Sequence, residues 1–402
     1  MTTKTIRGRC IAISGLSIQV RNEKGTSTVS VSRTPKNKAA LLGSIIEIQN
    51  GTCRILTPNR SHRKSIKWME HILNKRRMHA TGVRSEIENT IRNFFSMQKF
   101  QEVHTPLLVP CPGMEPHIKP FKVHGGPREF YLPTSPEFAM KRLLVGGLEK
   151  IFQICPSFRD EVRSKTHLPE FTMLEWYRAY AGYEKLMDDV EELFRLIAKD
   201  TYGKSIIKYG SNSISLSAPW PRLSVRQLFM EHAGIDLVKC DNRDKLANEC
   251  KQHNLRTNHD EDWDDIFFKI WLNIIEPKLP QDKAVFIYRY PPSQAALSAL
   301  DTDPDGSIWA KRFEVFIGGM ELGNAFEELT DPIEQRMRFK RDMQRRKELY
   351  GAYFPETPID EEFLHALEEG LPPCSGIAIG LDRMVMLFVN EPEIEYTKWV
   401  TN

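Results

Sequence analysis

The sequence is poor in cysteine, and its cysteines are not spaced as metal ligands or disulfide partners usually are. There are seven in 402 residues, none forms a CxxC pair, and they stand at Cys10, Cys53, Cys111, Cys155, Cys240, Cys250 and Cys374. Structural zinc sites and disulfide frameworks use closer or denser cysteines. The pattern argues against both and indicates reduced thiols, which predicts a cytoplasmic protein.

Long hydrophobic runs, internal repeats and low-complexity tracts are also missing. The opening MTTKTIRGRC is not followed by the apolar stretch of a signal peptide, and no window approaches the ~18 uninterrupted apolar residues of a membrane-spanning helix. We therefore expect no membrane association. A chain of 402 residues, 41% of them hydrophobic, is long enough for a large core and two domains.

Acidic residues are scarce at the N-terminus. Residues 1–79 hold 16 lysines and arginines against three glutamates, whereas residues 80–402 hold 40 basic and 50 acidic residues. A basic module favours a polyanionic partner, either RNA or an acidic protein. The alternative is a basic surface that only aids solubility.

The first 65 residues have the pattern of a small β-rich module. The stretches RCIAISGLSIQVRN and STVSVS alternate, and two further β-rich runs flank the hairpin signal Asn50-Gly51. Several strands in so short a segment predict a small barrel, similar to a reduced OB-fold. A polar linker, TPNRSHRKSIK, follows, and we place the two domains at 1–65 and 66–402.

The larger domain alternates helical and strand patterns. Apolar spacing predicts helices over 66–79, 83–100, 184–199, 224–233, 262–276 and 332–349. Strands are predicted over 101–109, which contains Pro106, and over 284–289, and a glycine-rich strand-to-helix turn over 375–388. This mixture favours an α+β fold with an antiparallel sheet over a doubly wound parallel sheet.

One predicted hairpin, RFEVFIGGMELGNAFEEL at 312–329, is rich in carboxylates. A two-residue glycine turn at 318–319 predicts that Glu314 pairs with Gly323. Because side chains alternate along a strand, Glu314 and Glu321 fall together on the face opposite the apolar residues. If that face is open to solvent they are surface charges, and if it is a cleft they are candidate ligands for Mg²⁺.

The stretch SFRDEVRSKTHLPEFTMLEWYR at 157–178 gathers chemically active side chains around one loop. It predicts two strands joined by a loop. Arg159 and Glu161 share a face of the first strand, and Glu175 and Tyr177 share a face of the second. The candidate residues around the loop are Arg159, Glu161, His167, Phe171, Glu175 and Tyr177. An arginine fork binds phosphate or carboxylate, and an aromatic ring stacks on a base. Together they indicate a nucleotide clamp.

Two further stretches mark helix starts. In TSPEFAMKRLL at 134–144, Ser135 is expected to cap a helix, with Pro136 in its first turn and Glu137 behind it. In GIAIGLDR at 376–383, glycines let the backbone approach a ligand and Arg383 stands at a helix start, where phosphate is favoured.

These stretches, in this order, resemble the three motifs of the class II aminoacyl-tRNA synthetases, and the likeness covers about residues 66–390. The helix 83–100 with Pro106 resembles motif 1, FRDE…H…EF motif 2 and GIAIGLDR motif 3. ELGNAFEEL is similar to the lysine-pocket strand of the lysyl-type enzymes. The resemblance implies a class II catalytic domain, an ATP-dependent lysine-activating ligase that uses Mg²⁺, and a homodimer.

The resemblance also implies roles for single residues at the nucleotide. Arg159 would hold the α-phosphate and the amino-acid carboxylate, and Glu161 would meet the adenine amino group. Phe171 would stack on the adenine ring, and His167 and Arg383 would bind the terminal phosphates. By the same likeness, Arg159 and Arg383 are the catalytic pair.

The implied roles at the metal and the amino acid are as follows. Mg²⁺ would be held by Glu314 and Glu321, the α-amino group by Glu137 and the carboxylate by Asn324. The ε-ammonium would be surrounded by Glu328, Glu175 and Tyr177. A buried ammonium needs such paired charge and acceptors.

The acceptor of the activated lysine is less plain. Lysyl-tRNA synthetases carry a full anticodon-binding domain, and they usually show glycine at the position of Ala378. LEWYR and PPCSG resemble instead the elongation factor P lysine lysyltransferases, which transfer lysine, preferably (R)-β-lysine, to a lysine of that protein. Those enzymes normally lack an N-terminal domain and have asparagine at the position of Leu168. We expect elongation factor P as partner, with tRNA charging by a compact synthetase, or a non-catalytic RNA-binding paralogue, as alternatives.

Overall fold

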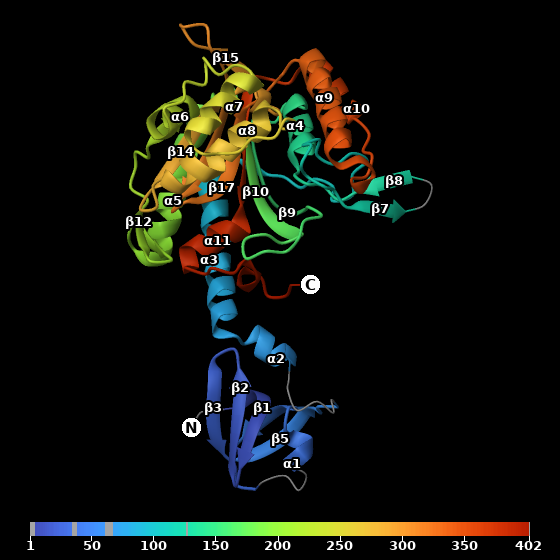
Figure 1. Ribbon diagram of the computed structural model, residues 1–402. Helices are drawn as coiled ribbons and strands as arrows, with labels where there is room; N and C mark the ends of the chain where they lie inside the picture. The colour runs from blue at the N-terminus through green and yellow to red at the C-terminus, as the bar shows by residue number, and fades with distance from the viewer. Residues whose placement is uncertain (1–4, 34–37, 61–66, 126–127, 402) are drawn as a thin grey trace. The chain divides into compact units, whose positions relative to one another are not determined.

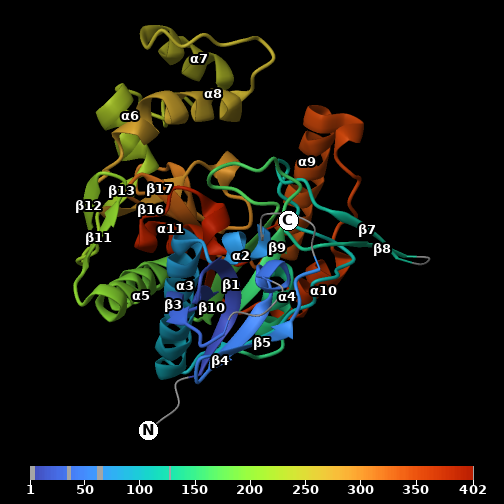
Figure 2. The ribbon, with the colours of Figure 1, turned by 90° about the horizontal axis from the view of Figure 1, so that it is seen from below.

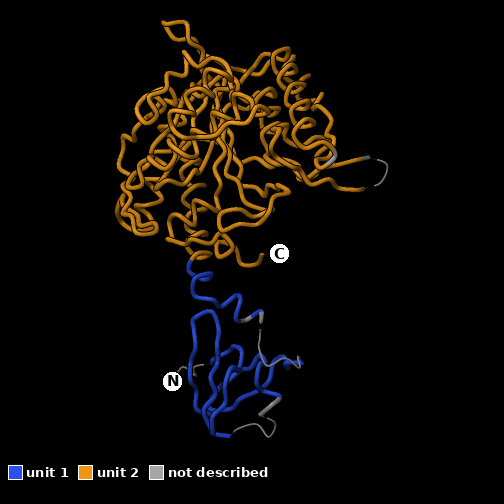
Figure 3. Tube along the Cα trace, viewed as in Figure 1, with its two compact units in different colours: residues 1–79, 402 blue, residues 80–401 orange. Residues whose placement is uncertain are grey.

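The computed structural model describes residues 5–33, 38–60, 67–125 and 128–401, and the chain divides into two compact units (Figure 3). Unit 1 is residues 1–79 and unit 2 is residues 80–401. The predicted boundary at residues 65 and 66, and part of the predicted linker, lie outside the described residues. The division falls inside α3 (Lys75–Met97). Arg21 donates to the carbonyl of Leu73 at 2.9 Å, which ties the segment after α2 (Lys67–Ile72) to unit 1.

Unit 1 is an antiparallel sheet in the order β3-β2-β1-β4-β5. Its elements are β1 (Ile6–Ser14), β2 (Ser17–Asn22), β3 (Gly25–Ser30), α1 (Lys38–Leu41), β4 (Ile45–Gln49) and β5 (Thr52–Thr57). The predicted Asn50-Gly51 hairpin joins β4 to β5, and both residues have positive φ, as such a turn requires. Among the described residues no ladder joins β3 to β5. The Ser32 N–H, just beyond β3, donates to the Gly51 carbonyl in the turn before β5 at 2.8 Å, so the two edges approach each other there, in keeping with the predicted barrel-like module.

Unit 2 is built on a nine-stranded, mostly antiparallel sheet in the order β13-β14-β16-β17-β18-β10-β9-β6, with β15 paired to β16 (Figure 1). The strands are β6 (Gln101–Glu102), β9 (Lys150–Phe158), β10 (Glu170–Ala179), β13 (Arg222–Ser224), β14 (Ala284–Tyr290), β15 (Leu300–Thr302), β16 (Ile308–Ile317), β17 (Met320–Glu327) and β18 (Cys374–Gly380). Two small hairpins complete it: β7 (Lys122–Gly125) with β8 (Arg128–Tyr131), and β11 (Ile206–Tyr209) with β12 (Asn212–Ser215). The predicted α+β class is confirmed.

Helices cover the two faces of the sheet unequally. One face packs against α3, α5 (Tyr183–Tyr202) and α11 (Leu381–Val389) in the largest core. A second core joins the sheet end at β14 and β16 to α6 (Val225–Ala233), α7 (Arg243–Gln252) and α8 (Trp263–Ile270). A third core holds α4 (Glu137–Val145), α9 (Pro332–Tyr350) and α10 (Glu361–Gly370). Figure 2 shows α6–α8 and α9–α10 as separate groups.

Several predicted bounds change in the structure. The strand predicted over 101–109 shrinks to β6, because Pro106 and Pro110 remove backbone donors. The helix over 262–276 is α8 followed by a π-helical turn, Trp271–Ile275. β9 ends at Phe158, so Arg159 and Glu161 lie in the following loop and do not share a strand face as predicted.

Two general findings bear on function. All seven cysteines are described residues with free thiols. Over the described ranges, no helix combines the length and the apolar character that crossing a bilayer demands.

Candidate active site

The face of the sheet opposite α3, α5 and α11 forms the floor of the site. Two rows of directly paired residues cross it from β10 through β18 and β17 to β16. The first row is Glu175, Ala378, Asn324 and Glu314, and the second is Tyr177, Gly376, Phe326 and Arg312. Residues two apart on a strand share a face, so both rows point to the same side. The neighbours Trp176, Ile377 and Ala325 point into the core beneath.

A β-bulge corrects the predicted register of the hairpin. The pairing runs from Val315 with Gly323 to Phe316 with Glu321, which leaves Leu322 as an extra residue. Glu314 therefore pairs with Asn324, and the predicted pairing with Gly323 is wrong. Strict alternation would turn Asn324 away from Glu321. The bulge lets both face the cleft while Leu322 stays in the core.

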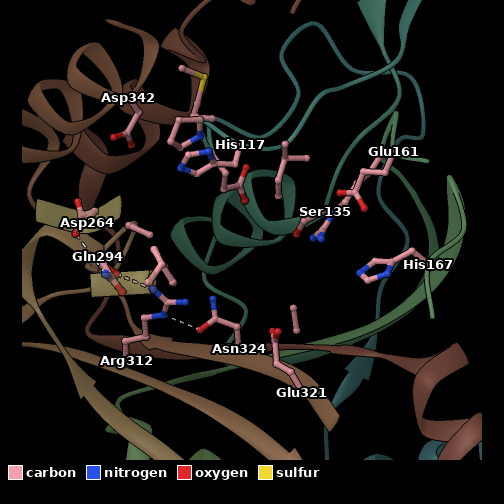
Figure 4. Close-up of a pocket in the computed structure, with 18 of the residues that line it drawn as sticks. His117, Ser135, Glu161, His167, Asp264, Gln294, Arg312, Glu321, Asn324 and Asp342 are labelled. Atoms are coloured by element: carbon pink, nitrogen blue, oxygen red, sulfur yellow. Dashed lines mark hydrogen bonds between the residues drawn. The ribbon is translucent and has the colours of Figure 1, made fainter. Parts of the chain in front are cut away.

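A cavity of about 1220 Å³ opens above this floor (Figure 4). Most of the predicted site residues line it: Glu137, Arg159, Glu161, His167, Phe171, Glu321, Asn324, Ala378 and Arg383. The others do not line it. Glu175, Tyr177 and Glu328 are buried behind its wall, and Glu314 is half-buried beside it. The structure thus brings the predicted set together in two layers, one open and one closed.

The closed layer is a cluster of carboxyl groups. The Tyr177 hydroxyl donates to Glu175 Oε1 at 2.7 Å, and the Ser135 hydroxyl donates to Glu175 Oε2 at 2.8 Å. Ser135 also accepts from the Glu137 N–H at 3.1 Å, although Pro136, not Ser135, occupies the N-cap position of α4. Gly376 is required here, because a Cβ on it would lie 2.1 Å from the Tyr177 ring. The missing side chain leaves room for Tyr177 to lie across the floor.

Lys141 completes the cluster, and the sequence analysis missed it. Its Nζ lies 2.6 Å from Glu137 Oε1 and 2.5 Å from Glu328 Oε2, and the side chain is 1% exposed. The signal was available, since Glu137 and Lys141 stand four residues apart on one helix. The buried layer therefore has its own ammonium group.

Burial dominates the proton affinities of this cluster. Desolvation and then the Glu137 charge raise the pKa of Glu175 to about 8. Desolvation also raises the pKa of Glu328 to about 8, although Lys141 opposes it. Burial alone would lower the pKa of Lys141, but Glu137 and Glu328 outweigh that effect and raise it. Lys141 is therefore charged at neutral pH, and the cluster holds fewer negative charges than its carboxyls could supply.

The open layer is cationic. The Arg159 guanidinium lies 5.1 Å from the centre of the Phe171 ring, and its buried Nε has no hydrogen-bond partner. An unpaired guanidinium donor beside an aromatic face suits an anionic group joined to a flat base. Glu161 lines the same side of the cavity, from the loop after β9.

Arg383 and His167 lie next to each other in this layer. Arg383 donates to the Glu321 carbonyl at 2.9 Å and contacts His167 Nε2 at 2.7 Å. Because a guanidinium only donates, Nε2 accepts and the ring proton is on Nδ1, facing the Ser164 hydroxyl at 2.9 Å. Desolvation and the Arg383 charge lower the pKa of His167, so the ring is neutral at pH 7.

A second buried contact fixes the start of α11, which carries Arg383. Asp382 is 1% exposed and accepts from the Thr172 N–H on β10 at 2.7 Å. Arg84 of α3 pairs with the same carboxylate and donates to the Thr172 hydroxyl at 2.8 Å. The three predicted motifs are thus joined through one aspartate, which positions Arg383 over the cleft.

Arg312 organises the floor, and it too was missed. It donates to Asn324 Oδ1 at 3.0 Å and to the Gln294 carbonyl at 2.8 Å (Figure 4). It also donates to Glu314 Oε1 at 2.5 Å. With its oxygen engaged, the Asn324 amide turns its NH₂ group toward other partners. Glu314 Oε2 accepts from the Tyr290 hydroxyl at 2.6 Å, so both Glu314 oxygens have protein partners.

The predicted Mg²⁺ ligands differ in how well they fit a metal. Solvent reaches Glu321 from the open side of the cleft. Desolvation by the surrounding protein, and then repulsion from Glu314, raise its pKa to about 7, which marks a carboxyl short of cations. Glu314 would have to share or release Arg312. No cluster of three or more His, Cys, Asp and Glu side chains occurs within the described residues, so phosphate oxygens and water would supply the other ligands.

Comparison with known proteins identifies the class. The sequence profile of the class II tRNA synthetases (D, K and N) matches residues 41–399, and this chain belongs to that family. A lysine–tRNA ligase from Dehalococcoides mccartyi is 36% identical over 313 residues, 77% of this chain and 61% of that protein. An elongation factor P–(R)-beta-lysine ligase from Edwardsiella ictaluri is 38% identical over 312 residues, 76% of this chain and 89% of that protein. One from Sodalis glossinidius matches to the same extent. The chain spans about three fifths of the first relative's length.

Proposed function

We propose that this protein is an ATP-dependent ligase that activates lysine or β-lysine as an adenylate and transfers it to a lysine side chain of elongation factor P. The observation that carries the proposal is the buried cluster of Glu137, Glu175, Glu328 and Tyr177 beside a cationic cleft. Such a cluster suits the ammonium end of an amino acid, because buried carboxylates without cations are unfavourable. A site of this kind strongly rejects uncharged isosteres.

In this proposal the side chains of the open layer bind the nucleotide. Arg159 binds the α-phosphate and the amino-acid carboxylate, and Phe171 stacks on adenine in place of the guanidinium. Glu161 accepts from the adenine amino group. His167 and Arg383 bind the β- and γ-phosphates, and the neutral ring can do so through its Nδ1 proton.

The amino acid lies across the floor, between the two layers. Glu137 takes the α-amino group and Asn324 donates its NH₂ to the carboxylate. Glu328, Glu175 and Tyr177 surround the ε-ammonium. Mg²⁺, held by Glu321 with Glu314 behind it, would neutralise charge on the phosphate oxygens when bound.

The chemistry needs no protein nucleophile. A substrate carboxylate oxygen attacks the α-phosphorus in line, the bond to the bridging oxygen breaks, and pyrophosphate leaves. The amine of the acceptor lysine then attacks the adenylate carbonyl, forming an amide and releasing AMP and a proton. The side chains of the site orient the reactants and stabilise developing negative charge.

The share of each relative that the match covers favours a protein acceptor. The matched region covers 89% of the Edwardsiella elongation factor P ligase but 61% of the Dehalococcoides lysine–tRNA ligase. A compact lysyl-tRNA synthetase is the second candidate, and unit 1 favours it: a five-stranded sheet with a basic sequence precedes the catalytic region. A non-catalytic RNA-binding paralogue would be expected to lack parts of the site.

A competition in one tube tests the acceptor. The full chain, ATP, Mg²⁺ and labelled lysine are mixed with unmodified elongation factor P and lysine tRNA, and labelled products are separated. Label on one lysine of the protein supports the proposal. Label on the RNA would assign the chain to tRNA charging. If no adenylate forms at all, the chain would instead be a non-catalytic RNA-binding paralogue. Repeating the reaction with labelled β-lysine compares the two donors.

We also propose a homodimer that uses the end of α3 and the segment after β6. Met97, Leu107 and Leu108 are large apolar side chains that are exposed there, and exposed apolar side chains are common at partner sites. Sedimentation of the full chain tests this: a dimer that Leu107→Asp and Leu108→Asp convert to monomer is expected, and a monomeric wild type would contradict it.

A further inference from the structure

Lys141 occupies an unusual place for a lysine. Its ammonium lies between Glu137 on the same helix and Glu328 at the end of β17, and it does not line the cavity. Behind it stands the Phe363 ring, 5.8 Å away. An ammonium so deeply buried is tolerated only with charged or hydrogen-bonding partners, and both glutamates place an oxygen beside it.

The cluster has more carboxyls than cations. Three carboxyl groups, on Glu137, Glu175 and Glu328, face the single ammonium of Lys141. Glu328 Oε1 is buried and has no hydrogen-bond partner. The other titratable groups that act on the cluster bring no further cation: Tyr177 on β10, Cys155 on β9, Cys374 on β18 and Glu115 before β7.

We infer that Lys141 is a positioning residue, the resident cation of a pocket that is balanced only when a substrate brings two ammonium groups. The inference rests on the proposed function and deepens it, because it says how the charges of the amino-acid pocket are balanced. Three carboxylates then meet three ammonium groups: Lys141, the substrate's amino group near its carboxylate, and the substrate's distal amino group. Lysine and β-lysine, the substrates proposed above, both bring two ammonium groups, whereas a monoamine leaves buried carboxyls protonated.

Proton release follows from this balance. Before substrate binds, the raised pKa values of about 8 keep Glu175 and Glu328 largely protonated at neutral pH. An arriving ammonium favours their ionised forms, so binding expels protons to solvent. Lysine affinity therefore rises with pH through this range. Lys141 sets the pH at which this rise is centred, because its charge lowers the pKa values of Glu137 and Glu328.

The test compares Lys141→Met with the wild type in lysine-dependent pyrophosphate exchange from pH 6 to 9. We expect the lysine KM at neutral pH to rise about 100-fold and its pH midpoint to move up by about one unit, with the ATP KM nearly unchanged. Arg142→Met is the matched control, since Arg142 follows on the same helix and points to Asp360 outside the cluster. It is expected to change neither KM nor midpoint.

A second measurement applies if the variant does not fold. Calorimetry of lysine binding to wild-type protein in buffers of different ionisation enthalpy counts the protons released, and we expect one to two per lysine at pH 7. Release of none, or a Lys141→Met variant with wild-type KM and pH midpoint, would overturn the inference. A wild type without any lysine-dependent exchange would instead overturn the proposed function.

Discussion

The two layers of the cleft bind charge in opposite ways. The closed layer keeps Glu175, Glu328 and Lys141 out of water, with the buried Glu137 at its border with the cavity, whereas solvent reaches the open layer, where His167 and Glu321 are exposed. The carboxyls of the closed layer face one another and a single cation. In the open layer, by contrast, the Arg383 guanidinium donates to a backbone carbonyl, that of Glu321.

The difference suggests a division of labour. A buried charge left without its partner is strongly unfavourable, so the closed layer can discriminate between side chains. Exposed charges are screened and adaptable, which suits phosphates that must enter and leave. Identity of the amino acid would be read in the closed layer, and the nucleotide would be held and activated in the open one.

Glu328→Gln should have the largest effect. Removing one partner of a buried charge pair is unfavourable by ~3–5 kcal/mol, so lysine-dependent pyrophosphate exchange should fall by about 1000-fold or more. Glu327→Gln is the control, because Glu327 is next in sequence but pairs with Lys311 at 2.6 Å. Exchange at the wild-type rate in Glu328→Gln would remove the closed layer from amino-acid binding.

Arg159→Ala tests the open layer. Loss of the guanidinium should reduce the exchange rate by about 100-fold and raise the ATP KM, because a charge-assisted contact to the reacting phosphate is gone. The pH dependence of the lysine KM should stay as in wild type. Arg163→Ala, in the same loop but exposed and outside the cavity lining, should be nearly silent. A shift in the lysine pH midpoint would show that the layers are not independent.

The closed layer should also make the free energy of unfolding depend on pH. Glu175 and Glu328 have pKa values of about 8, above those of unfolded carboxyls, so the folded state binds more protons between about pH 5 and 8. The free energy of unfolding should fall as pH rises through this window, by about 5 kcal/mol from pH 6 to 9 in the free protein, because each of the two carboxyls contributes about half. Denaturant titrations at both pH values measure it, and saturating lysine should reduce the fall. A stability that rises over this range would contradict the pKa assignment.

Sequence patterns located most of the cleft but not its geometry. Alternation and helical spacing found the strands β10, β16 and β18 and the helices around them, because each has a strong local period. The bulge at Leu322 has no such signal, and it decides that Asn324 faces the cleft. The prediction of strand ends fails for the same reason, because no local sequence signal indicates that β9 ends before Arg159.

Long-range charge partners were the other gap. Lys141 meets Glu328 across 187 positions, a pairing that no local spacing reveals, although its contact with Glu137 was within reach. Arg312 was overlooked two residues from Glu314, on the very face under study. Both are counter-ions of carboxylates that the sequence patterns do locate.

Ala378→Gly should have the smallest effect and bears on the floor between the layers. Ala378 pairs with Glu175 on one side and Asn324 on the other, so its methyl group stands between the groups proposed for the two ends of the amino acid. Removing it adds about one methylene of space, which alters discrimination by ~1–3 kcal/mol. We expect the ratio of kcat/KM for α-lysine over β-lysine to change about tenfold, with the ATP KM unchanged. Ala325→Gly, on the same sheet but facing the core, is the control for a general loss of packing. An unchanged ratio in Ala378→Gly would mean that the floor does not choose between donors, and that the choice lies with Glu137 and the contacts around the amino group.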